Sequence, residues 1–186
     1  MTRSVLRTAT FDIEAHGDIG DSYSMECTAL TIRTTDGNKV YYFTGGEDDI
    51  REGCEILLTY PRLCSFNGKG FDLKVLAKYF PKNTYQKVRN TPHYDLYQEW
   101  LRRYRSRMSL ENLSHATLGA DRGKFTLDVS PTALWKADPP KFRAYNEWDC
   151  YVTHLLFLHV IVNGYVLANL GKAKRKFYPE SLSRIG

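Results

Sequence analysis

Four acidic side chains dominate the chemistry that this sequence could perform: Asp12 and Glu14 in FDIEA, Asp72 in NGKGFD, and Asp149 in YNEWD. The chain separates them widely, but each falls where the predicted elements would bring it to one edge of a sheet. Carboxylates a few ångströms apart repel one another unless cations lie between them. Divalent cations held by oxygen ligands favour phosphoryl chemistry, so the pattern predicts a metal site for that chemistry.

The places of these acids on the predicted elements favour convergence. Asp12 and Glu14 are two residues apart on a β-rich segment, so both side chains leave the same side of a strand. Asp72 follows a predicted strand and falls in the first turn of a helix, at the rim where α/β sheets bind ligands. Tyr145 lies four residues before Asp149 in a long predicted helix, so the phenol and the carboxyl share a face.

Each motif taken alone has a structural alternative. Two acids on an exposed strand need no metal, and an acid in a first helical turn, such as Asp72, is stabilised by the helix dipole. Tyr145 could simply pack while Asp149 is exposed, although this helical face is otherwise suited to burial, where an acid needs a partner. Asp95 precedes a helix in HYDLYQEW, where an N-cap is favoured over a fifth ligand.

The first half of the chain predicts a mixed sheet. Three β-rich segments form an antiparallel meander, at Thr8–Ala15, Thr28–Thr35 and Val40–Thr44, with a hairpin turn at Asp36-Gly37. A helix over Asp48–Leu58, a strand over Arg62–Asn67 and a helix over Phe71–Phe80 follow. The order of strand, helix and strand favours a parallel extension of the meander. The fold class is therefore α/β, with a mixed sheet flanked by helices.

The second half is predicted to be mainly helical. Helices are expected over Leu96–Arg105, Leu110–Leu118 and Pro140–Val162, with an irregular segment over Asp121–Val129. Residues 1–165 then form one domain. Residues 166–186 form a basic extension, which is either docked or partly mobile.

Composition indicates a folded, intracellular protein, and we expect it in the cytoplasm. The chain has 186 residues, 42% of them hydrophobic, and no apolar run of about 18 residues that could cross a membrane. No signal peptide is recognisable. The four cysteines show no metal-binding spacing and are expected to be reduced, structural thiols: Cys27, Cys54, Cys64 and Cys150. A net charge of +5 gives modest support for a polyanionic partner.

FDIEA, NGKGFD and YNEWD, in that order, resemble the three exonuclease motifs of the DEDD 3′–5′ exonuclease superfamily, which has a ribonuclease H-like fold. Tyr145 lies four residues before Asp149, and this spacing resembles the third motif of the DEDDy branch. That branch includes proofreading domains of DNA polymerases. The sister branch has a histidine five residues before the last aspartate, where this chain has Ala144. The segment SLENLSHATLGADRGKF also resembles stand-alone members of the branch.

The resemblance implies a role for each matching residue. Asp12, Glu14 and Asp149 would ligate two divalent ions, Mg²⁺ or Mn²⁺, with Asp12 bridging them and Asp72 acting mainly through metal-bound water. Tyr145 would help to orient the attacking water. One ion would lower the pKa of that water while the other stabilises the leaving 3′ oxygen. The products would be nucleoside 5′-monophosphates released from a free 3′ end.

Substrate contacts are predicted for residues that flank the motifs. His16, Asn67, Lys69 and Phe71 could touch the terminal nucleotides by hydrogen bonding or stacking, although core packing is favoured for Phe71. Arg103 belongs to an arginine-rich helix with Trp100 and Tyr104. That helix is either a strand-binding face or an ordinary exposed charged helix.

Single-stranded DNA is the first expectation for the substrate, and RNA the second. Two other classes of function stay open: a catalytically inactive module that binds nucleic acid, and a structural subunit of a replication or repair assembly whose other proteins are separate chains. An endonuclease on the same fold is a nearer rival to the exonuclease.

Overall fold

The computed structural model describes residues 7–122, 127–171 and 173–179. The strands are β1 (Ala9–His16), β2 (Glu26–Thr34), β3 (Val40–Phe43), β4 (Leu63–Ser65), β5 (His93–Asp95), β6 (Val166–Leu170) and β7 (Ala173–Phe177). The α-helices are α1 (Glu47–Leu58), α2 (Asp72–Val75), α3 (Tyr85–Asn90), α4 (Leu96–Tyr104), α5 (Leu110–Leu118), α6 (Pro131–Ala137) and α7 (Pro139–Asn163). Short 3₁₀ turns span Leu76–Lys78 and Ala120–Arg122.

The main sheet has five strands in the order β3-β2-β1-β4-β5. β1, β2 and β3 pair antiparallel, and β4 and β5 extend the sheet in parallel with β1. The turn between β2 and β3 contains Gly37 and Asn38, both with positive φ, as the Asp-Gly signal favours. The predicted mixed sheet, with a meander extended by parallel strands, is confirmed.

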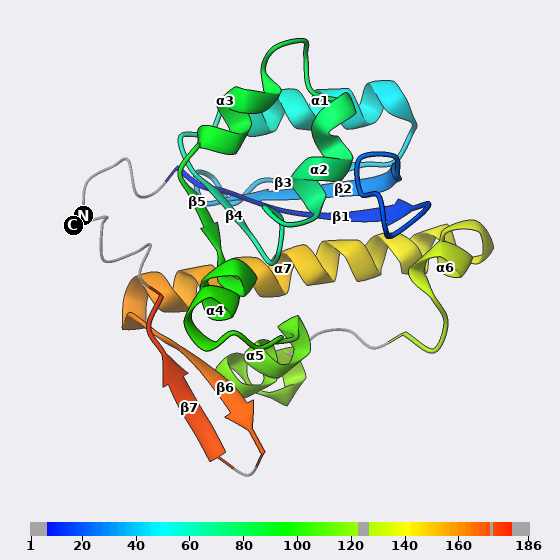
Figure 1. The fold of residues 1–186 in the computed structure, drawn as a ribbon. Helices are drawn as coiled ribbons and strands as arrows, with labels where there is room; N and C mark the ends of the chain where they lie inside the picture. The colour runs from blue at the N-terminus through cyan, green and yellow to red at the C-terminus, as the bar shows by residue number, and fades with distance from the viewer. Residues whose placement is uncertain (1–6, 123–126, 172, 180–186) are drawn as a thin grey trace.

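Helices cover both faces of the sheet (Figure 1). α1, α2 and α3 lie on one face, where Phe11 and Ile13 of β1 join a large apolar cluster. α7 crosses the other face, and α4, α5 and the β6–β7 hairpin pack beyond it around a second cluster that includes Trp100 and Phe177. Alternate side chains of β1 therefore pack on opposite faces of the sheet, as expected along a strand.

α7 agrees closely with the predicted long helix because its boundary signals are strong. The Asp138 side chain accepts a hydrogen bond from the Lys141 amide, Pro139 occupies the first turn, and Gly164 ends the helix with a φ of 79°. Asp95 caps α4 in the same way by accepting from the Gln98 amide. The N-cap interpretation of Asp95 is therefore confirmed.

Several short elements differ from the prediction. β5, α3, α6 and the β6–β7 hairpin were not expected, because each is too short or too polar to show a clear period. The predicted helix over Phe71–Phe80 is broken into α2 and a 3₁₀ turn. Asn67 does not end a strand: β4 stops at Ser65, and Asn67 lies in the following turn with a φ of 71°. Part of the predicted irregular segment, 123–126, falls outside the described residues.

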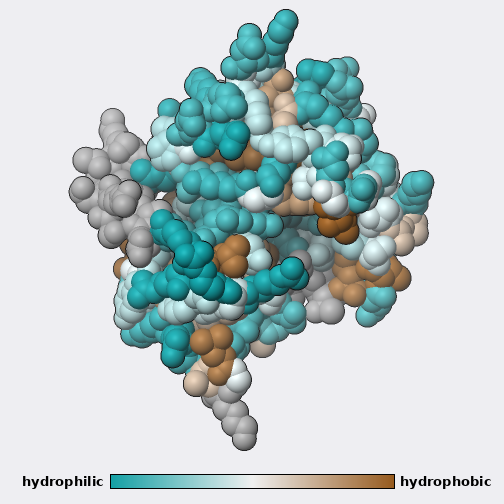
Figure 2. All heavy atoms as spheres, viewed as in Figure 1, coloured by the Kyte–Doolittle hydropathy of each residue, from teal (hydrophilic) through white to brown (hydrophobic). Residues whose placement is uncertain are grey.

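The surface is mostly polar in the view of Figure 2, with small and separate hydrophobic patches. Within the described residues, no helix combines the length and the apolar character needed to cross a membrane. All four cysteines are buried and unpaired with one another, so the expectation of structural thiols is confirmed.

α7 contacts the sheet through polar as well as apolar side chains. His154 Nδ1 lies 2.8 Å from Thr10 Oγ1, and both residues are buried. Burial, with a smaller contribution from the Arg33 charge, lowers the pKa of His154 from 6.5 to about 4. A proton on this ring would therefore oppose the packing of α7 on β1.

We expect the stability to fall in acid partly because of His154. Above about pH 6.5 the ring is neutral in both states. Between about pH 6.5 and 4 the unfolded chain binds a proton that the folded protein does not, so the free energy of unfolding should fall by on the order of 3 kcal/mol. Urea unfolding of wild type and His154→Gln at several pH values measures this. Parallel pH curves for the two proteins would contradict it.

Candidate metal centre

Three carboxyl groups from two distant segments meet at the face of β1 that α7 covers. One oxygen of each of Asp12, Glu14 and Asp149 can be chosen so that the three atoms lie within 4.8 Å of one another. Asp12 and Glu14 are partly buried, whereas Asp149 is only 3% exposed. The structure therefore brings together the two carboxyls of FDIEA and the carboxyl of YNEWD.

A short chain of hydrogen bonds fixes Asp12 relative to α7. Asn146 Nδ2 donates to Asp12 Oδ2 at 2.9 Å, and Thr31 Oγ1 donates to Asn146 Oδ1 at 2.6 Å. Thr31 sits directly opposite Asp12 in the β1–β2 register, and both Thr31 and Asn146 are fully buried. One turn further along α7, Cys150 Sγ lies 3.5 Å from the Thr10 carbonyl oxygen. These contacts set the position of Asp149 against β1.

Asp72 approaches the same strand from the side. β4 pairs with β1 only at Ala9 and Thr10, and no other strand among the described residues pairs with the rest of that β1 edge. The Ile13 amide, between Asp12 and Glu14, donates a hydrogen bond to the Asp72 carboxylate. Among the described residues, Asp72 is not a member of the group of three mutually close carboxyls. It lies beside that group, at the edge of β1.

The pKa of Asp72 is raised from 3.8 to about 7, mainly by burial and then by the negative charge of Asp95. Hydrogen bonds from the backbone amides of Asp72 and Ile13 act in the opposite direction. Burial also raises the pKa of Asp95, against hydrogen bonds from the amides of Lys69, Gln98 and Asn67. Near pH 7 the Asp72 carboxyl is therefore partly protonated, and a cation bound beside it would favour loss of that proton.

Residues at the ends of β4 and β5 hold the loop between β4 and α2 (residues 66–71) in position. Asp95 accepts hydrogen bonds from the Asn67 amide at 2.9 Å and the Lys69 amide at 2.8 Å. Ser65 Oγ contacts His93 Nε2 at 2.7 Å and accepts from the Gly68 amide at 3.0 Å. The glycines of NGKG fit this packing, because a Cβ at Gly68 would collide with Ser65. These contacts hold the loop in one conformation, which places Asp72 beside β1.

The remaining predicted site residues lie in different settings. Tyr145 is 7% exposed and lies one turn before Asp149 on α7. The His16 ring packs 5.3 Å from that of Trp135 of α6, at the end of β1. Phe71 is partly buried against the first apolar cluster, in agreement with the favoured core interpretation. Asn67 Oδ1 accepts a hydrogen bond from Gln98 Nε2 at 2.8 Å, so its amide oxygen has an internal partner.

Two predicted cationic contacts are exposed. Lys69 projects from the loop beside Asp72 and lines a surface pocket. Arg103 Nη1 lies 3.5 Å from the carbonyl oxygen of Tyr178, so this arginine contacts the segment after β7. Trp100, which was considered for the same strand-binding face, is only 1% exposed and packs on Tyr104 and Phe177. The hypothesis that Trp100 forms part of an exposed strand-binding face is therefore wrong.

Sequence analysis missed Asn146, Thr31 and His93 as supports of the site. Asn146 lies inside the YNEWD motif, three residues before Asp149 and on the same helical face, so its position was a usable signal. Thr31 and His93 carry no local signal, because their partners Asn146 and Ser65 lie far away in the chain.

The three carboxyls form a ligand set suited to divalent ions. Carboxylate oxygens are hard ligands suited to Mg²⁺ and Mn²⁺. Their separation is short enough for shared coordination, and the Asn146 hydrogen bond orients Asp12 in the way that supporting residues orient metal ligands. The pKa of the neighbouring Asp72 is raised by a different combination, mainly its burial and then the charge of Asp95.

Comparison with protein families gives one match. The profile of the RNase H superfamily matches residues 9–137, which include β1, β4 and α2. A comparison with curated proteins gives no match.

Solved structures with a similar fold include nucleic-acid enzymes. The family B DNA polymerase of Pyrobaculum calidifontis aligns with a TM-score of 0.64 and 18% identity, over 84% of this chain and 24% of the polymerase. A zinc-bound complex of E. coli exonuclease I with single-stranded DNA aligns with a TM-score of 0.50 and 12% identity, over 84% of this chain and 41% of that protein. The chain thus spans less than half the length of either protein. At these identities the likeness supports the ribonuclease H-like fold.

We expect Mn²⁺ to stabilise the protein through the three carboxyls. At about 100 times its dissociation constant, an ion that binds only the folded state adds about 2.7 kcal/mol. Asp12→Asn should lose this gain. Without metal it should be at least as stable as wild type, because one repelling charge is gone. Thermal unfolding with EDTA or Mn²⁺ measures both effects. Asp18→Asn, at an exposed acid of the β1–β2 loop, is the control and should respond like wild type.

Proposed function

The chain belongs to the RNase H superfamily, and we propose that it is a metal-dependent 3′–5′ exonuclease of the DEDDy type. The substrate is nucleic acid with a free 3′ end, single-stranded DNA in preference to RNA, and the products are nucleoside 5′-monophosphates. The observation that carries the proposal is the meeting of Asp12, Glu14 and Asp149 within 4.8 Å. Residues 1–165 form the catalytic domain, and residues 166–186 are an accessory extension.

Asp12, Glu14 and Asp149 would hold two divalent ions, Mg²⁺ or Mn²⁺. When bound, such ions activate water and neutralise charge on a phosphodiester undergoing displacement. Asn146 keeps Asp12 in position, and its buried contact with Thr31 prevents rotation of the amide. Asp72 supports the same centre from the β1 edge, and Tyr145 orients the attacking water from α7. The family match over residues 9–137 supports the roles of Asp12, Glu14 and Asp72. The burial of Asp149 beside Asp12 and Glu14, one turn after the buried Tyr145, supports the roles of the two α7 residues.

His16 and Lys69 contact the substrate near its 3′ end, whereas Phe71 and Asn67 shape the loop beside them from within the fold. His16 follows the two carboxyls of β1, and Lys69 and Phe71 flank Asp72 in the chain. Asn67 acts through the loop that it shapes with Gln98. Arg103 contacts the strand further away, beside the C-terminal hairpin. Cationic and aromatic side chains of this kind suit a single strand with accessible bases.

Digestion of 5′-labelled oligonucleotides tests the proposal. With Mg²⁺ or Mn²⁺, we expect a ladder that shortens from the 3′ end of single-stranded DNA, and Asp149→Asn should abolish it. A second oligonucleotide carries a blocked 3′ terminus and should resist digestion. Cutting of the blocked strand would instead indicate an endonuclease. No product from DNA or RNA, single- or double-stranded, with either metal would favour an inactive binding module.

Asn146→Ala should reduce activity without removing a metal ligand. The loss of an outer hydrogen bond to a ligand typically costs about 10- to 100-fold in metal affinity or activity. We expect a loss in this range, with a matching rise in the Mn²⁺ concentration needed for half-maximal rate. Thr153→Ala is the control, since it also shortens a buried side chain of α7 but lies beyond Asp149. Equal losses in the two variants would show that Asn146 acts only through folding.

A further inference from the structure

A pocket of about 140 Å³ lies outside the group of three carboxyls, between the β1–β2 loop, the loop before α2, and α3. Its lining residues are Tyr23, Lys69, Leu73, Lys74, Tyr85 and Arg89. α2 and α3 lie together on the sheet face opposite α7 (Figure 1). Lys69 and Lys74 flank Asp72 at three and two residues, so the pocket adjoins the acidic edge of β1 without including its carboxyls.

The charge of the pocket is entirely positive. Lys69, Lys74 and Arg89 line it, and no acidic residue among those that the structure describes does so. Within the part of the chain that the structure describes, none of the three forms an ion pair with an acid. Lys69 lies in the field of the buried Asp95, but no ion pair among the described residues neutralises the three cations, so an anion in the recess would reduce their mutual repulsion.

Two tyrosines supply flat apolar surfaces in the same recess. Tyr85 packs 6.1 Å from the Phe80 ring and partly against the core, so its ring is held in place. Tyr23 is 50% exposed. Burial, followed by a hydrogen bond to the Tyr23 hydroxyl, raises the pKa of Tyr85 to about 12. The Arg89 guanidinium lies 5.8 Å from the centre of the Tyr85 ring.

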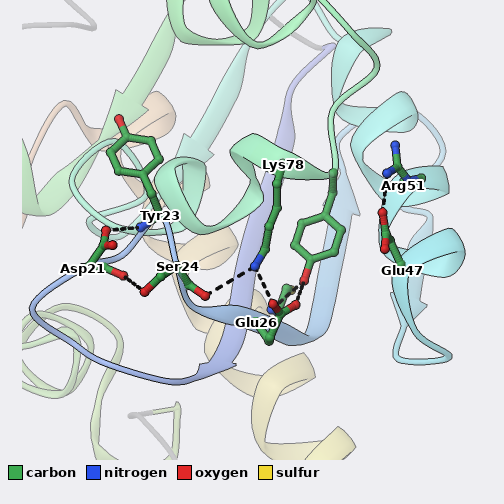
Figure 3. A network of polar contacts seen from close by, with 9 residues as sticks. Asp21, Tyr23, Ser24, Glu26, Glu47, Arg51 and Lys78 are labelled. Atoms are coloured by element: carbon green, nitrogen blue, oxygen red, sulfur yellow. Dashed lines mark hydrogen bonds and ion pairs between the residues drawn. The ribbon is translucent and has the colours of Figure 1, made fainter.

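The β1–β2 loop is built to present Tyr23. The Asp21 carboxylate accepts a hydrogen bond from the Tyr23 amide at 3.1 Å, and the Asp21 carbonyl accepts from Ser24 Oγ at 2.9 Å. Lys78 Nζ then binds the Ser24 carbonyl and the Glu26 carboxylate. Figure 3 shows the Tyr23 ring directed away from this polar network. The exposed ring therefore stands on a fixed turn, which reduces the entropy lost when a ligand binds it.

We propose that this pocket binds a nucleotide of the substrate strand other than the one undergoing hydrolysis. Its phosphate contacts Lys74, Arg89 and Lys69, and its base contacts the Tyr23 ring beside Tyr85. Stacked aromatic rings among cations are the usual means of holding a single strand without sequence preference. The inference rests on the proposed function: the ligand is taken to be part of the nucleic-acid substrate because the pocket adjoins the proposed nuclease centre.

The double variant Lys74→Gln/Arg89→Gln tests the phosphate contacts. Fluorescence anisotropy with a 5′-labelled 12-nucleotide single-stranded DNA, in Ca²⁺ to prevent turnover, should show affinity weaker by roughly tenfold. The slope of log affinity against log salt should become shallower by about 0.7, since the contacts of one phosphate are lost. Lys87→Gln is the matched control, because Lys87 is an exposed cation of α3 that does not line the pocket.

The Tyr23 ring is tested separately. Tyr23→Ala should weaken binding roughly tenfold, and Tyr23→Phe, which keeps the ring, should bind like wild type. For the digestion reaction, the double variant should raise KM and leave kcat close to wild type. A double variant with wild-type affinity and salt slope would overturn the proposal, and so would a fall in kcat alone.

These outcomes are distinct from a failure of the proposed nuclease. A wild-type protein that binds the oligonucleotide but never cuts it would refute the exonuclease, while the variants would still decide the role of the pocket. A wild-type protein that cuts while its pocket variants bind and cut normally would refute the pocket alone.

Discussion

The packing of α7 across β1 and β2 determines whether this protein has a metal centre at all. Asp149 lies more than 130 residues after Asp12 and Glu14, and three like charges do not gather spontaneously. Buried polar contacts hold the helix in one register on the sheet: Asn146 with Asp12 and Thr31, and His154 with Thr10. Buried polar groups without partners are costly, so a shifted helix would lose several hydrogen bonds together. The repulsion among the carboxyls is thus opposed by contacts that also specify their geometry.

A second constraint acts on the other side of β1. β4 is only three residues long and leaves the far part of the β1 edge open. The loop from Ser65 to Gly70 enters this opening under the control of Asp95 and His93, both almost fully buried. Burial lowers the pKa of His93 to about 3, so the ring stays neutral while it contacts Ser65. The short strand therefore contributes to the site directly, because a longer β4 would occupy the place of Asp72.

In the proposed nuclease, the acidic centre and the cationic pocket would have complementary electrostatic roles. A phosphodiester approaching Asp12, Glu14 and Asp149 meets negative charge unless cations are bound there. Lys69 and Lys74, on either side of Asp72 in the chain, place positive charge next to that centre. A strand held by its other phosphates could thus be brought near carboxyls that would repel it in isolation. The net charge of +5 does not reveal that acidic and basic side chains are segregated into these two neighbouring sites.

The sequence by itself determined the elements with strong local signals and the identity of the acids. The Asp-Gly turn, the caps of α7 at Asp138 and Gly164, and the two-residue spacing of Asp12 and Glu14 are set by nearby residues, and each was predictable. β5, α6 and the β6–β7 hairpin were not, because short strands and helices form where neighbouring layers complete their packing.

Only the tertiary structure decided which supports surround the acids. Asn146, Thr31 and His93 gain their roles from partners that are distant in the chain. Trp100 proved to be a core residue for the same reason, since Phe177 covers it from the C-terminal hairpin. Side-chain type and spacing state what chemistry a residue can perform. Burial and hydrogen bonding across the chain decide whether it is placed to perform it, because both depend on surfaces that exist only after folding.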